Sequence, residues 1–172
     1  FDGGSAVFNS EGCCIRQFPF FEEANSSSHN DNFIKEKILN EDLIIRALTL
    51  GIKDYVHKSS FNNVVIGLSG GIDSAVTCAL AVAALGKEHV KGITMPSEYS
   101  STGSVQDSYR LAENLGITCE TLEIKSTVNV YQETLSPLFK GLPENEAEEN
   151  IQARIRGDLL MAAGALAFGP ET

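Results

Sequence analysis

A short apolar segment followed at once by a glycine-rich turn constrains the fold of this chain more than any other feature. Residues 63–68 read Asn-Val-Val-Ile-Gly-Leu, a continuous β-branched run typical of a strand buried on both faces. The next residues, Ser-Gly-Gly-Ile-Asp-Ser at 69–74, form a turn that leads into an apolar helical pattern. A buried strand joined to a helix by a tight turn indicates that a parallel α/β sheet begins here.

The rest of the chain continues this alternation. We expect strands over residues 90–95 and 118–124, and helices over residues 73–85, 101–115, about 127–139 and about 146–167. Gly86 and Gly116 stand where the first two of these helices should end, and Asn40 is a plausible N-cap for an earlier helix. The pattern predicts a doubly wound parallel sheet that binds ligands at the carboxyl ends of its strands.

The first 39 residues have a different character. Residues 1–23 alternate short apolar runs with turn formers and predict a small antiparallel β pair, which is only marginally stable alone. Residues 24–39 are rich in Asn, Ser and Glu and predict a linker before a domain over residues 40–172. The chain starts at Phe1, without Met, and stops just after a helical pattern, so we expect a longer parent protein.

Composition excludes several kinds of partner. Thirteen basic against 23 acidic residues give a net charge of -10, which argues against a broad contact surface for nucleic acid or anionic membrane. The four cysteines lack the spacing of a zinc site, and no apolar stretch is long enough to span a bilayer. A cytoplasmic protein with reduced thiols is therefore expected.

The turn at residues 69–74 has the composition of an anion site. Its glycines let a ligand approach the backbone, and the first amides of the following helix point at that ligand. It is neither a Walker A loop nor a GxGxxG loop. Asp73 would repel a phosphate unless a divalent cation lies between them, so we predict that Asp73 binds Mg²⁺. The alternative is a plain turn, with Asp73 favoured only by the helix dipole.

The sequence Ser-Gly-Gly-x-Asp-Ser resembles the signature of the ATP pyrophosphatase family, whose members adenylylate a substrate oxygen and release pyrophosphate. This motif alone leaves GMP synthetase, asparagine synthetase, tRNA-modifying enzymes and NAD synthetase open. Residues 95–101 (Met-Pro-Ser-Glu-Tyr-Ser-Ser) and 149–156 (Glu-Asn-Ile-Gln-Ala-Arg-Ile-Arg) resemble NAD synthetases, and the resemblance runs over about residues 40–167. It implies the Rossmann-like fold of the adenine nucleotide alpha hydrolases.

Residues 1–23 resemble the end of the nitrilase-like glutaminase domain that precedes the synthetase in glutamine-dependent NAD synthetases. In that family the catalytic Cys, Glu and Lys of the glutaminase come before the segment matched here. Cys13 and Cys14 follow the match and have no nearby Lys, so we do not expect either to be the nucleophile. No catalytic residue is assigned.

The resemblance implies two sets of binding residues and one metal ligand. Asp73 would bind Mg²⁺, while Asn150 and Arg154, one helical turn apart, would contact deamido-NAD. A solvated amide for Asn150 and a surface ion pair for Arg154 are the alternatives. The residues implied to bind ATP are Gly67, Leu68, Ser69, Gly70, Gly71, Ile72, Asp73 and Ser74.

Residues 95–101 are implied to contribute to the nucleotide pocket. Met95 would contact adenine through its backbone, and Ser97 and Ser100 would line the pocket. Ser101 could do the same, or serve as a plain helix cap. Arg156 receives no role.

The activity implied is ATP-dependent amidation of deamido-NAD to NAD through an adenylylated intermediate, with ammonia from glutamine in a homodimer or higher homo-oligomer. Because the family has further ATP and magnesium residues after the last matched helix, we expect this chain alone to be inactive. A binding or regulatory module without catalysis is the alternative, and the presence of Asp73 argues against it.

Overall fold

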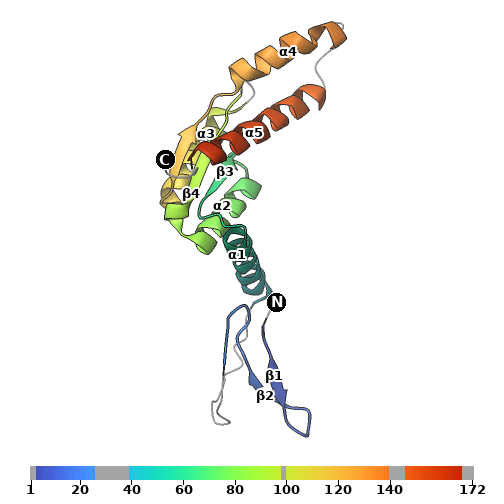
Figure 1. Ribbon diagram of the computed structural model, residues 1–172, viewed down its shortest axis with the longest axis vertical. Helices are drawn as coiled ribbons and strands as arrows, with labels where there is room; N and C mark the ends of the chain where they lie inside the picture. Colours follow the sequence, from blue (N-terminus) through green and yellow to red (C-terminus); the bar gives the residue numbers. More distant parts are fainter. Residues whose placement is uncertain (1–2, 26–38, 98–99, 140–145, 168–172) are drawn as a thin grey trace. The chain divides into compact units, whose positions relative to one another are not determined.

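The computed structural model describes residues 3–25, 39–97, 100–139 and 146–167 (Figure 1). The chain divides into two compact units, residues 1–55 and 56–172. None of the described helices is long and apolar enough to cross a membrane.

The first unit contains the predicted antiparallel pair. Strand β1 (Ala6–Phe8) pairs with β2 (Cys14–Gln17), and an isolated bridge joins Gly3 to Phe20. In the turn between them, Asn9 Oδ1 accepts hydrogen bonds from two main-chain amides. Helix α1 (Asn40–Lys58) starts in this unit, with Asn40 as its first helical residue. The predicted linker lies almost entirely outside the described residues.

The second unit is a three-stranded parallel sheet with helices on both faces. The strands run in the order β3 (Val64–Leu68), β4 (Val90–Thr94) and β5 (Thr118–Thr121). A 3₁₀ turn, Lys87–His89, precedes β4. The α-helices are α2 (Ile72–Leu85), α3 (Thr102–Leu115), α4 (Lys125–Phe139) and α5 (Glu146–Ala167).

Two apolar cores cover the two faces of the sheet, which confirms the doubly wound class. Helices α2 and α3, which form the two consecutive crossovers, pack on one face, as a constant right-handed crossover requires. After β5 the chain passes to the other face, where α4 and α5 pack. The first core contains Leu68, Cys78, Ala81, Val90 and Ala112, and the second contains Ile93, Met95, Ile124, Val128 and Ile155.

Alternation along β3 assigns its side chains to these two cores. Val64, Ile66 and Leu68 pack against the first core, whereas Val65 packs against the second. Side chains on both faces of β3 thus pack into a core, as predicted, and Leu68 is the most deeply buried residue of the strand. In the described part of the chain, β3 pairs with β4 alone.

Strand β5 is shorter than the predicted range of 118–124. Beyond Thr121 the chain still runs beside β4, because Leu122 N donates to Thr94 O (2.9 Å) and Ile124 N donates to Pro96 O (3.2 Å). These bonds place the Ile124 side chain in the second core, where none of its surface is exposed.

Replacing Ile124 with Ala should lower the free energy of unfolding of this unit by about 2–5 kcal/mol, because it leaves a cavity in a close-packed core. Leu122→Ala is the matched control, since Leu122 is 37% exposed and also precedes α4. It should cost about 1 kcal/mol or less. Urea denaturation measures both values, and equal losses would contradict the assigned core.

Candidate functional site

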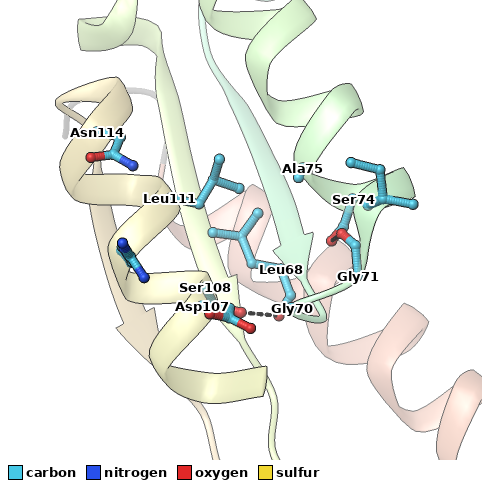
Figure 2. A pocket seen from close by; sticks show the side chains of 11 residues that line it. Leu68, Gly70, Gly71, Ser74, Ala75, Asp107, Ser108, Leu111 and Asn114 are labelled. Atoms are coloured by element: carbon cyan, nitrogen blue, oxygen red, sulfur yellow. Dashed lines mark hydrogen bonds between the residues drawn. The ribbon is translucent and has the colours of Figure 1, made fainter. Parts of the chain in front are cut away.

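The predicted anion turn lies at the carboxyl end of β3, where the strand ends at the buried residue Leu68 (Figure 2). Residues 69–71 connect β3 to α2, and Gly71 is the N-cap residue of that helix. The structure therefore gathers the eight residues 67–74 into one strand end, turn and helix start.

The two serine hydroxyls of the turn bind each other and the turn itself. Ser74 Oγ donates to Gly71 O (2.9 Å), and Ser69 Oγ accepts from Gly71 N (3.2 Å). The two hydroxyl oxygens are 3.1 Å apart. The proton of Ser74 Oγ is directed at Gly71 O, which makes Ser69 Oγ the donor in this arrangement. Both hydroxyls thus bond within the turn, and the first-turn amides of α2 are further donors at the same place.

The start of α2 has the electrostatics of an anion site. Gly71 has an extended backbone (φ -90°, ψ 159°), and no side chain caps the first turn of the helix. The first-turn amides and the positive end of the helix dipole therefore favour a negative charge here. The exposed Asp73 lies in the same first turn.

Position 70 requires a glycine for two reasons. Its φ of +79° is a left-handed conformation that glycine adopts without strain. A Cβ at this position would lie 2.5 Å from Ser104 O and 2.6 Å from Ser104 Cα, in the first turn of α3. The turn therefore rests directly on the backbone of α3.

A cavity of ≈ 370 Å³ lies between the start of α2 and one side of α3 (Figure 2). This volume is at the lower end of the usual range for small-molecule sites. Besides Ser108, its polar residues on α3 are Asp107, Arg110 and Asn114, and none of the four was predicted as a site residue. The spacing of Asp107, Arg110 and Asn114 by three and four residues along the predicted helix 101–115 was the available signal. The lining residues are Leu68, Gly70, Gly71, Ile72, Ser74, Ala75, Asp107, Ser108, Arg110, Leu111 and Asn114.

The segment after β4 is held by α5. Met95 is buried, and its carbonyl accepts a hydrogen bond from Arg156 Nε (3.1 Å). Burial lowers the pKa of the Arg156 guanidinium from its ordinary value, although a guanidinium stays charged in proteins. Arg156 thus fixes the backbone of Met95, whose predicted contact with adenine stays a prediction.

The three serines of this segment form local turns. Ser97 N donates to Ser100 Oγ (3.0 Å). Ser101 is the N-cap of α3, because its Oγ accepts from Ser104 N (3.1 Å), so the helix-cap interpretation of Ser101 is confirmed. Residues 98–99 lie outside the described residues.

Asn150 and Arg154 are exposed and lie one turn apart on α5. Arg156, on the same helix, binds the carbonyl directly after β4, so this part of α5 lies near the carboxyl end of the sheet. The prediction that both side chains contact a dinucleotide stays a prediction.

The described residues contain no group of three or more His, Cys, Asp or Glu side chains that could hold a metal ion. Asp73 would supply a single carboxylate. This fits Mg²⁺, which commonly binds one or two carboxylates together with substrate phosphates and water.

Comparisons with known proteins place these features in one family. A family model described as NAD synthase matches residues 44–167. The glutamine-dependent NAD(+) synthetase of Synechocystis sp. is 44% identical over 94% of this chain and 31% of its own length. That of Thermotoga maritima is 46% identical over 79% of this chain and 24% of its own length. The chain thus spans about a third or less of these curated relatives.

Two solved structures extend the comparison. The glutamine-dependent NAD+ synthetase of Acinetobacter baumannii, in complex with ADP, has a TM-score of 0.90 at 40% identity and covers 98% of this chain and 34% of its own. The NH3-dependent NAD synthetase of Campylobacter jejuni, in complex with nitrate, has a TM-score of 0.66 at 30% identity, over 76% of this chain and 55% of its own.

Gly70→Ala should destabilise the second unit by more than the roughly 1 kcal/mol that a left-handed alanine costs, because the new Cβ also meets the backbone of Ser104. Gly116→Ala is the matched control. Its φ is +68°, and its Cβ would meet only the flexible side chain of Lys87. Thermal unfolding of the two variants measures the difference. Equal shifts would show that the contact with α3 adds nothing.

Proposed function

The chain belongs to the NAD synthase family, and on this premise we propose that it provides the ATP site of a glutamine-dependent NAD synthetase, which amidates deamido-NAD to NAD. The turn after β3 carries this proposal, since it offers uncapped helix amides to an anion at the carboxyl end of a parallel sheet. The ADP bound in the Acinetobacter baumannii relative supports a nucleotide as the ligand.

Gly67 to Ser74 would bind the phosphates of ATP. Since both serine hydroxyl protons are used inside the turn, the main-chain amides would make the phosphate contacts. Gly70 and Gly71 carry no side chain that would keep a phosphate away from these amides.

Asp73 would hold Mg²⁺ against the bound phosphates. The ion would neutralise charge on the leaving pyrophosphate. The exposed position of Asp73 in the first turn of α2 leaves its carboxylate free to share an ion with the substrate.

Deamido-NAD would bind along α5. Asn150 would donate a hydrogen bond from its side-chain amide to the dinucleotide. Arg154 would form an ion pair with a phosphate through its guanidinium. The bond from Arg156 to the carbonyl of Met95 brings this helix toward the end of β4, beside the proposed nucleotide pocket. The two substrates would therefore meet at the carboxyl ends of the strands.

The reaction would proceed in two steps. An oxygen of the nicotinate carboxylate of deamido-NAD attacks the α-phosphorus of ATP, a P–O bond forms, and the bond to pyrophosphate breaks. Ammonia then attacks the activated carbonyl carbon, loses a proton and displaces AMP, which leaves the amide of NAD. The residues of this chain act by orienting the substrates and stabilising charge, because none of them forms a covalent bond in either step.

Ammonia would come from glutamine through a nitrilase-like glutaminase, of which residues 1–23 would be the last part. The protein would act as a homo-oligomer in the cytoplasm. Inactivity of the 172 residues alone stays a prediction, which an assay for NAD from ATP, deamido-NAD and ammonia would test.

Asp73→Asn should lower pyrophosphate release in the full-length protein by roughly 100-fold or more, because a neutral amide is a poor ligand for Mg²⁺. Glu113→Gln removes one exposed carboxylate elsewhere and should leave the rate unchanged. Release should also require deamido-NAD. Release that is indifferent to deamido-NAD would indicate another ATP pyrophosphatase.

Arg154→Gln should raise the KM for deamido-NAD roughly 10-fold or more through loss of a charge-assisted hydrogen bond, while the KM for ATP stays the same. Lys87→Gln, an exposed cation in the 3₁₀ turn before β4, serves as the control for charge. Steady-state kinetics with each substrate varied in turn would measure both constants. An unchanged KM would favour a surface role for Arg154.

A further inference from the structure

We propose that Ser108, on α3, is a positioning residue for the turn at residues 69–74, called the ATP turn below. Ser108 is remote from this turn in the sequence. Its hydroxyl fixes the carbonyl of Leu68 and thereby sets the orientation of the amide that begins the turn. The inference rests on the proposed function only where it concerns ATP.

The contacts of Ser108 link α3 to the end of β3. Its side chain is 1% exposed and lies in the cavity wall beside Leu68 (Figure 2). The hydroxyl oxygen is 2.9 Å from Ser104 O and 3.3 Å from Leu68 O, so its one proton is shared between the two carbonyls and the bond to Leu68 is the longer one. A serine inside a helix often binds the carbonyl four residues earlier. The second acceptor is unusual because it belongs to a strand 40 residues away.

The peptide plane transmits this contact to the turn. Leu68 C=O and Ser69 N–H belong to one planar peptide group, so a fixed carbonyl also fixes the direction of the amide. Ser69 N donates to Ser74 Oγ (3.3 Å), and Ser74 Oγ donates to Gly71 O. The hydroxyl of Ser108 is therefore one peptide group away from the hydrogen bonds that shape the turn.

A second contact joins the same two elements. The backbone of Ser104 lies against Gly70, at the position where a Cβ would otherwise be. Ser104 O also accepts the hydrogen bond from Ser108, and Ser104 N is capped by Ser101. The N-terminal part of α3 thus contacts Leu68, directly before the ATP turn, and Gly70 within it.

The contacts with α3 begin where the sheet ladder of β3 ends. The ladder restrains the strand as far as Leu68, which is opposite Thr94. Beyond this residue the contacts with α3 add to the internal hydrogen bonds of the turn.

The test compares Ser108→Ala with Tyr109→Phe in the full-length, ligand-free protein. Tyr109 is the next residue on α3, and its hydroxyl bonds Thr121 Oγ1 (2.7 Å) at the end of β5. Both variants therefore delete one hydroxyl hydrogen bond between α3 and the sheet, but only Ser108 reaches β3. Hydrogen exchange should become about 2- to 10-fold faster over residues 68–76 in Ser108→Ala and stay unchanged there in Tyr109→Phe. Equal exchange in all three proteins would overturn the proposal.

Substrate binding gives the second readout. Ser108→Ala should raise the dissociation constant of Mg²⁺·ATP about 2- to 10-fold, with the KM for deamido-NAD unchanged. A general loss of packing would weaken both substrates together and would overturn the proposal, as would unchanged ATP affinity beside a wild type that binds ATP. Faster exchange of residues 68–76 in a protein whose wild type binds no ATP would support the positioning role of Ser108 and refute the proposed function.

Discussion

The close approach of the turn after β3 to the backbone of α3 is the constraint on which the site depends. Gly70 has a left-handed φ and lies where any side chain would meet Ser104. The helix that follows, α2, starts at the carboxyl end of the sheet with no side chain capping its first amides. The cavity lies beside this contact, between the start of α2 and α3, and Gly70 is one of its lining residues.

Small residues within the strands serve packing on both faces of the sheet. A Cβ on Gly67 would lie 2.9 Å from Leu160 of α5, and a Cβ on Gly92 would lie 2.7 Å from Leu68. Glycine at these positions lets α5 approach β3 and lets Leu68 fill the first core. Gly67 therefore leaves room for a side chain of α5 and Gly92 leaves room for a side chain of the neighbouring strand, whereas Gly70 serves the turn.

Much of the architecture could be predicted from the sequence because its local signals agree. The helix ends at Gly86 and Gly116, the strand at 64–68 and the turn at 69–74 each follow from nearby residues. The cavity wall on α3 could be predicted only in part, because the spacing of Asp107, Arg110 and Asn114 puts them on one side of the helix but does not show that this side faces α2. The contacts of Ser108 and Arg156 join elements 40 and 61 residues apart, and no local pattern predicts them.

The hydrogen bonds of the Ser69 and Ser74 hydroxyls have a consequence for how this turn would bind a phosphate. Because both hydroxyls bond within the turn, we expect the turn to keep its shape when a phosphate binds, which would limit the ordering entropy lost on binding. Contacts to the phosphate itself would then depend mainly on the backbone dihedral angles, whereas Asp73 would act through the metal ion. A substitution in this turn should be judged first by the φ and ψ it permits, and only then by the functional group it adds or removes.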